Sequence, residues 1–71
     1  MAFGTNQKVR RESMGMSQAE LADKTGVRAP MINQIEMGTK IPSLALAISI
    51  AKELGCSMDY LCDTEFVTTK I

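Results

Sequence analysis

Arg28, Asn33 and Gln34 are the residues whose chemistry best matches a nucleic acid. A guanidinium can form a bidentate contact with a guanine edge or bind a phosphate. An amide carries the paired donor and acceptor that match the major-groove edge of adenine. Asn33 and Gln34 follow Pro30 by about one helical turn, so in a helix they share a face with its N-terminal end. If this helix enters the major groove, we expect all three to contact DNA bases. The alternatives are a solvated surface arginine at Arg28 and an Asn33 that faces sideways into solvent.

The residues between them, Ala29, Pro30 and Met31, are apolar and cannot form bidentate hydrogen bonds. They can contact a thymine methyl group or simply allow the helix to approach closely, and Ala29 is counted among the expected base contacts. Because few side chains in this stretch can form hydrogen bonds with base edges, we expect weak direct recognition of the base sequence. More of the selectivity would then come from DNA shape.

Groups suited to a phosphate lie on either side of this stretch. Gln18 is expected at the start of a helix, where N–H groups and a partial positive charge attract anions. Gly38, Thr39 and Lys40 combine backbone N–H groups, a hydroxyl and an ammonium in one loop. All four are expected to contact phosphates. The alternative is an exposed helix end and an ordinary surface turn.

Two short helices joined by a tight turn must position these groups. Ser17 is a good N-cap for the first helix, Gly26 permits the sharp bend, and Pro30 fits the first turn of the second. Apolar and capping patterns predict helices over about residues 5–13, 18–25, 29–37 and 44–54, and a short helix that is capped by Ser57 and reaches about Leu61. The β-branched and threonine-rich residues 64–71 predict a tail or a short strand.

The predicted helix 44–54 carries two apolar stripes. The first should face the core and comprises Leu44, Ala47, Ile48, Ala51 and Leu54. The second, Leu46 and Ile50, is either core as well, because the helix is central, or part of a dimer contact. The further apolar residues that could join such a contact are Tyr60, Phe66, Val67 and Ile71.

Length and charge allow this interpretation but limit it. The chain has 71 residues, of which 45% are hydrophobic and 4% aromatic, so one domain with a small aliphatic core is expected. The net charge is zero, but residues 1–40 carry six basic and four acidic side chains, whereas residues 41–71 carry two and four. Phosphate neutralisation depends on local charge, so the asymmetry supports DNA binding only modestly.

Several classes of function lack the residues that they need. The chain has no histidine, no glycine-rich phosphate loop, no metal-ligand spacing and no nucleophile beside a base. Catalysis, a metal, a cofactor and a small-molecule ligand are therefore not expected. Cys56 and Cys62 lie in apolar surroundings and are expected to be small thiols in or near the core. No signal peptide or membrane span is recognisable, which predicts a soluble, cytoplasmic protein.

Four sequence segments resemble the Cro/repressor-type (XRE-like) helix-turn-helix DNA-binding family, and they are separated by the spacings usual in that family. The resemblance covers about residues 3–62. They are Ser17–Ala22, Ile35–Gly38, Pro42–Leu44 and Leu54–Leu61. The resemblance implies an all-α, compact five-helix bundle of the phage-repressor DNA-binding domain type. The domain would span residues 1–63, its recognition helix would be the one over 29–37, and residues 64–71 would form a C-terminal tail.

The resemblance also implies roles for individual residues. Gln18 matches the family residue whose amide and backbone N–H bind a phosphate. Arg11 and Glu36 match an ion pair beneath the DNA face, which could hold Arg11 near a phosphate. Gln7 departs from the family because its position is usually apolar.

Together these patterns predict a sequence-specific transcriptional regulator that binds double-stranded DNA as a homodimer and represses by covering its operator. The alternative is a protein-interaction subunit on the same fold, of the antitoxin or anti-repressor type. Neutral net charge and the apolar residues Ala29, Pro30 and Met31 favour that alternative.

Overall fold

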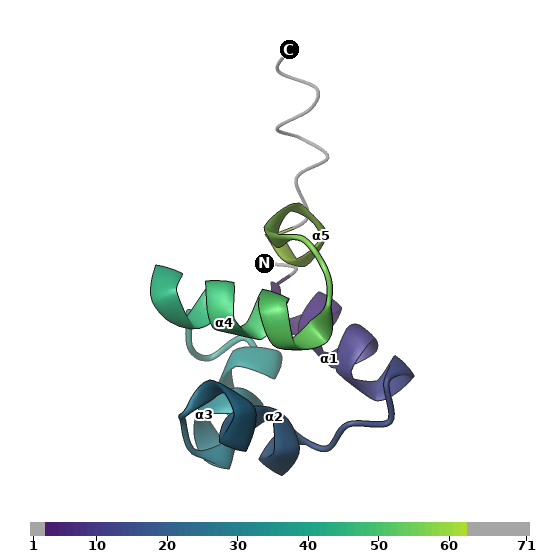
Figure 1. The fold of residues 1–71 in the computed structure, drawn as a ribbon. Helices are drawn as coiled ribbons and strands as arrows, with labels where there is room; N and C mark the ends of the chain where they lie inside the picture. Colours follow the sequence, from purple (N-terminus) through teal and green to yellow (C-terminus); the bar gives the residue numbers. More distant parts are fainter. Residues whose placement is uncertain (1–2, 63–71) are drawn as a thin grey trace.

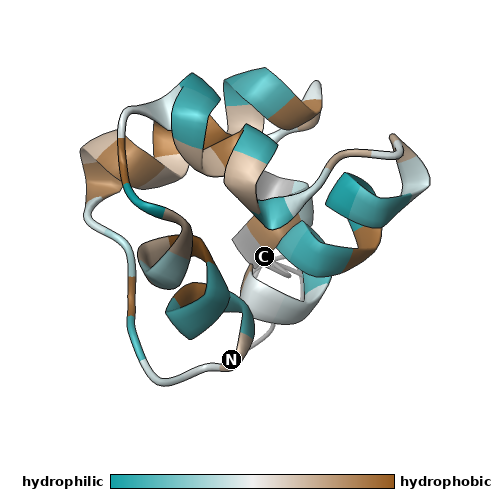
Figure 2. Cartoon of the chain, turned by 90° about the horizontal axis from the view of Figure 1, so that it is seen from below, coloured by the Kyte–Doolittle hydropathy of each residue, from teal (hydrophilic) through white to brown (hydrophobic). Residues whose placement is uncertain are grey.

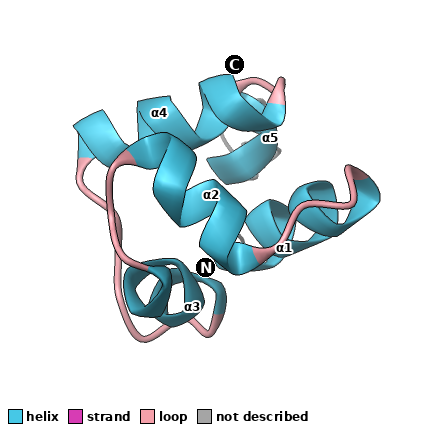
Figure 3. Cartoon of the chain, turned by 60° about the horizontal axis from the view of Figure 1, so that its bottom comes forward, coloured by secondary structure: helices cyan, strands magenta, loops and turns pink. Residues whose placement is uncertain are grey.

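The computed structural model describes residues 3–62, and these form an all-helical bundle (Figures 1 and 3). The helices are α1 (Phe3–Ser13), α2 (Gln18–Thr25), α3 (Ala29–Glu36), α4 (Leu44–Leu54) and α5 (Met58–Cys62). The predicted fold class is confirmed. Helices α2 and α4 have the expected bounds, and the ends of the other helices differ from the expected ones by at most two residues. Phe66, Val67 and the rest of the predicted tail lie outside the described residues.

Local capping signals explain where α2 begins and ends. Ser17 Oγ accepts a hydrogen bond from the backbone N–H of Glu20 at 3.0 Å, and the Glu20 carboxylate accepts one from the N–H of Ser17 at 2.8 Å. This reciprocal pair satisfies two donors at the helix start. The same contacts lower the pKa of Glu20. Gly26 then takes φ 76°, a left-handed conformation that favours glycine, and the chain turns toward α3.

The helices enclose one apolar core of mainly aliphatic side chains. Figure 1 shows α2 and α3 at one end of the molecule and α5 at the other, with α1 and α4 between them. Figure 2 looks onto the α2–α3 end, where hydrophilic and hydrophobic residues alternate along the helices. The buried apolar side chains are Phe3, Leu21, Ala22, Ile32, Ile35, Ala47, Ile50, Ala51, Leu54 and Leu61. Cys56 is half-buried against this core, and burial raises the pKa of its thiol.

The predicted inner face of α4 was partly wrong. Leu44 and Ile48 are 70% and 43% exposed, whereas Ile50 is fully buried. The buried face runs through residues 47, 50, 51 and 54, which is a regular i, i+3, i+4, i+7 pattern. Leu46 is half-buried against the core. Ile50 therefore belongs to the core and is not available as the dimer contact that the sequence left open.

Helix α1 is held by close contacts with two other helices. Gly4 lies so near the end of α3 that an added Cβ would overlap the carbonyl oxygen of Ile35 and lie 3.0 Å from Glu36 Cα. At the other end of α1, Arg10 Nε donates to the carbonyl of Leu54 at 2.8 Å and satisfies an otherwise free group at the end of α4. Sequence reasoning found neither contact.

No helix within residues 3–62 is both long enough and apolar enough to cross a bilayer.

Candidate nucleic-acid interface

A bidentate ion pair between α1 and α3 lies beneath the candidate surface. Arg11 Nε and Nη2 donate to the two carboxylate oxygens of Glu36 at 2.8 and 3.0 Å. Arg11 Nη1 donates to the carbonyl of Met16 at 2.7 Å. The two charged side chains are only 8% and 2% exposed. This pair, which the family resemblance implied, ties the end of α3 to α1 and to the loop before α2.

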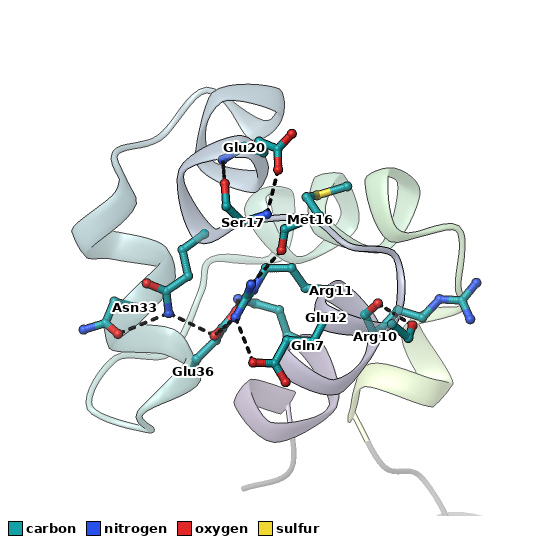
Figure 4. A network of polar contacts seen from close by, with 11 residues as sticks. Gln7, Arg10, Arg11, Glu12, Met16, Ser17, Glu20, Asn33 and Glu36 are labelled. Carbon is teal, nitrogen blue, oxygen red and sulfur yellow. Dashed lines mark hydrogen bonds and ion pairs between the residues drawn. The ribbon is translucent and has the colours of Figure 1, made fainter.

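Two glutamines complete the surroundings of the Glu36 carboxylate (Figure 4). Gln7 Nε2 donates to Oε2 at 2.9 Å, and Gln18 Nε2 donates to Oε1 at 3.1 Å. Burial alone would raise the pKa of Glu36. The hydrogen bonds from Arg11, Gln7 and Gln18, with the positive charge of Arg11, outweigh that effect and lower the pKa. The hydrogen bond to Glu36 in turn raises the pKa of Arg11.

Gln7 has a role that sequence reasoning did not find. Its side chain is fully buried, and its Oε1 has no hydrogen-bond partner among the described residues. A buried carbonyl without a partner is destabilising, so its cost is set against the hydrogen bond that Nε2 gives to the carboxylate. The only signal in the sequence was a polar residue at a position that is apolar in the family.

The depth of Arg11 speaks against the phosphate contact expected from the sequence. Its Nε, Nη1 and Nη2 all donate to protein oxygens, and the side chain lies almost entirely below the surface. Arg11 therefore orients α1 and α3 rather than presenting a free charge. Arg28 and Lys40, which lie just before and just after α3, are exposed.

The outward side of α3 carries three of the expected base contacts. Arg28, Asn33 and Gln34 are exposed, and Arg28 occupies the N-cap position with an extended backbone. Ala29, the fourth, is half-buried and packs partly against the core, which leaves only part of its methyl group accessible. The opposite side of the helix is sealed by Ile32 and Ile35, which are 0% and 2% exposed.

The sequence predicts that Gln18 contacts a phosphate through its side-chain amide and its backbone N–H. These two groups differ in whether they are already hydrogen-bonded within the protein. Its amide nitrogen donates to Glu36 Oε1 and also to Asn33 Oδ1, at 3.1 and 3.2 Å. Both amide N–H groups are therefore used inside the protein. The backbone N–H groups of Gln18 and Ala19 begin α2 and join no hydrogen bond among residues 3–62. The helix end, and not the side chain, keeps the capacity to bind an anion.

The loop after α3 has fewer groups free to bind a phosphate than the sequence predicts. The N–H groups of Gly38 and Thr39 donate to the carbonyls of Ile35 and Gln34 at 3.1 and 3.0 Å, and so close the helix. Thr39 Oγ1 also donates to the Gln34 carbonyl, at 3.2 Å. A phosphate at this loop would therefore meet chiefly the exposed Lys40.

The α2–turn–α3 unit and its supports match a known family. A family model described as helix-turn-helix matches residues 8–61, which include all of α2, α3 and α4. The chain belongs to this helix-turn-helix family. The assignment agrees with the resemblance to Cro/repressor-type proteins found in the sequence.

Two curated proteins are similar to this helix-turn-helix chain. One is the uncharacterized HTH-type transcriptional regulator YqaE of Bacillus subtilis, 33% identical over 63 residues, with 89% of this chain and 54% of YqaE covered. The other is an uncharacterized HTH-type transcriptional regulator of Methanothermobacter thermautotrophicus, 44% identical over 45 residues, with 63% of this chain and 65% of the relative covered. The match thus spans about half of YqaE and about two thirds of the Methanothermobacter protein.

Two solved structures of the P22 c2 repressor are also similar, each with a TM-score of 0.82 and 31% identity. The first is a crystal structure of the repressor in complex with synthetic operator 9T, and the match covers 86% of this chain and 92% of the repressor chain. The second is a solution structure of the DNA-binding domain, with 87% and 82% covered. The five-helix arrangement is therefore that of a repressor DNA-binding domain.

Proposed function

We propose that this helix-turn-helix protein is a transcriptional regulator that binds double-stranded DNA by inserting α3 into the major groove. The observation that carries the proposal is the two-sided character of α3. Its outer side exposes Arg28, Asn33 and Gln34, and its inner side is closed by Ile32 and Ile35. The similarity to an operator-bound repressor at 31% identity supports the same orientation.

Base and phosphate contacts then fall to different groups. Arg28, Asn33 and Gln34 contact base edges, and Ala29 offers a partly accessible methyl group. Phosphates are bound by the backbone N–H groups that begin α2 and by Lys40 in the loop after α3.

The domain comprises residues 1–63 and acts by binding without catalysis. Covering an operator is sufficient for repression.

Selection of bound fragments from a random DNA pool tests this function. We expect recovery of a defined sequence, weakened binding of that sequence by Arg28→Ala or Gln34→Ala, and no change with Lys52→Ala. Lys52 is an exposed lysine of α4 and controls for the loss of one positive charge. The affinity should fall steeply with salt, by about 0.9 in log K per log salt for each phosphate bound. Failure to enrich any sequence would favour the protein-interaction alternative.

We further propose that two copies bind together through the exposed apolar residues around the start of α4. Leu44 and Ile48 lie one turn apart on α4 and are 70% and 43% exposed, and Ile41, in the loop before α4, is 76% exposed. Three side chains cannot supply the roughly 800 Å² per partner that a stable complex buries, so the dimer should be weak in solution and form on DNA with two half-sites. Tyr60, which is 43% exposed, is a further candidate, as are Phe66 and Val67 beyond the described residues.

Sedimentation with and without the selected duplex tests the dimer. A monomeric free protein and two copies per symmetric site are expected, with Leu44→Ser reducing occupancy of the second half-site. A single copy on every selected site would refute the proposal.

A further inference from the structure

The Glu36 carboxylate fixes the direction of each hydrogen bond made to it. An ionised carboxylate only accepts, and the pKa of Glu36 is lowered, so the group is charged at neutral pH. Gln18 has its amide within 3.1 Å of Glu36 Oε1. It must therefore turn its NH2 group, and not its carbonyl oxygen, toward the carboxylate.

The orientation of Gln18 in turn determines the orientation of Asn33. The same Gln18 nitrogen lies 3.2 Å from Asn33 Oδ1. With the Asn33 amide turned the other way, two NH2 groups would face each other without an acceptor. Asn33 therefore directs its oxygen toward Gln18. Figure 4 shows its amide nitrogen at the outer end of the network.

The outward nitrogen of Asn33 is available to a ligand. Its contact among the described residues is with Met37 Sδ at 3.7 Å, and a thioether sulfur is a weak acceptor. Met37 is 69% exposed and can move aside. Asn33 itself is exposed. The network thus leaves a donor on the outer surface of α3 and holds the acceptor of the same amide inward.

We propose that Asn33 acts as a hydrogen-bond donor that selects a base with a major-groove acceptor, and that Gln18 is the positioning residue that fixes this polarity. The inference rests on the proposed DNA binding and deepens it. Suitable acceptors are N7 or O6 of guanine, N7 of adenine and O4 of thymine. It replaces the two-point match of Asn33 to adenine that the residue type alone suggested.

Gln34 provides an internal comparison within the same helix. Its amide is exposed, and its side chain takes part in no hydrogen bond among residues 3–62. Gln34 can therefore rotate and pair with adenine through both donor and acceptor. The two neighbouring amides are expected to differ in what they read, although their chemical groups are the same.

The test uses the DNA sequence recovered by selection from the random pool. The base that Asn33 contacts is found as the position of this sequence at which the Asn33→Ala protein no longer prefers one base. At that base, loss of the acceptor should weaken binding about tenfold, as for loss of one base contact. A 7-deazapurine removes a purine N7, and 4-thiothymine or 6-thioguanine replaces the carbonyl oxygen with a weakly accepting sulfur while the base pair is kept. If the base is adenine, replacing it with purine, which lacks the exocyclic amino group, should leave affinity within twofold.

The positioning role of Gln18 needs a readout that general destabilisation would not produce. Gln18→Ala should free the Asn33 amide and shift the preferred base at its position toward adenine, while preferences elsewhere persist. Lys52→Ala should leave every preference unchanged.

Three results would overturn the inference while leaving DNA binding intact. They are a loss on amino-group removal as large as that on acceptor removal, an Asn33→Ala variant with unchanged preference at every position, and a Gln18→Ala variant with unchanged preference at the Asn33 position. Absence of any selected sequence would instead overturn the proposed function, and this inference with it.

Discussion

Replacing Glu36 with glutamine removes the charge that organises the buried network and keeps nearly the same shape. Four hydrogen bonds converge on this carboxylate, two from Arg11 and one each from Gln7 and Gln18. A glutamine has one acceptor oxygen and an NH2 group that would face some of these donors. The Arg11 guanidinium, whose side chain is 8% exposed, would then be buried without its counter-charge.

The expected loss in the free energy of unfolding is large for so small a domain. Removing one partner of a buried ion pair costs about 3–5 kcal/mol, and we take about 3 because Arg11 also donates to Met16. For a domain of this size each kcal/mol shifts the melting temperature by about 4–8 °C, which gives a shift of at least about 12 °C. Urea and thermal unfolding followed by circular dichroism at pH 7 measure both quantities.

The matched control is Glu53→Gln, which removes the same charge from an exposed position of α4. Glu53→Gln should stay within about 0.5 kcal/mol of the parent protein, as exposed substitutions generally do. If Glu36→Gln were as mild as Glu53→Gln, the Arg11–Glu36 pair would contribute nothing beyond a surface contact, and the reasoning about the network would be refuted.

The same variant gives a pH dependence with a defined sign. The pKa of Glu36 is lowered in the folded protein, so the stabilisation is fully present above the unfolded value, near 4.3, and is lost as pH falls through the folded pKa. The stability difference between the parent protein and Glu36→Gln should therefore be largest near neutral pH and shrink below about pH 4. A difference that stayed constant down to pH 2 would contradict this account.

Three further substitutions test separate parts of the structure. Gly4→Ala should lower the free energy of unfolding by about 1–3 kcal/mol, because the new Cβ overlaps the end of α3, and an unchanged urea midpoint would contradict that close contact. Lys40→Ala should reduce the slope of log K against log salt by about one on the selected DNA, whereas Lys52→Ala should not, and equal slopes would remove Lys40 from the phosphate contacts. Ile50→Ala should cost about 2–5 kcal/mol in chemical denaturation, while Leu44→Ala stays within about 0.5 kcal/mol, and similar losses would contradict the orientation of α4.

Helix positions were predictable because their signals are local. The Ser17 cap, the left-handed Gly26 and the apolar pattern of residues 21–35 act within one or two turns of the chain, and α2 has the expected bounds. The orientation of α4 was not predictable in the same way. Apolar residues occur on all sides of α4, so only its contacts with α1, α2 and α5 decide that Ile50 faces inward and Ile48 outward.

The site shows the same division between local and non-local information. Residue types were sufficient to select Arg28, Asn33 and Gln34 as exposed polar groups of α3. The direction of the Asn33 amide could not be found in this way, because it depends on Gln18 and Glu36, which come from two different helices. Gln7 was recognised only as an anomaly, since its partner lies 29 positions away along the chain.

Titration of isotopically labelled protein with the selected duplex is the most direct test of the central claim that the outer side of α3 contacts DNA. The predicted result is a set of NMR signal changes centred on Arg28 and on the side-chain amides of Asn33 and Gln34, with smaller changes at the start of α2. Where two copies pair on the duplex, Leu44 and Ile48 should change as well, in addition to these signals. Changes centred instead on Leu44 and Ile48, with the Asn33 and Gln34 amide signals unmoved, would contradict it.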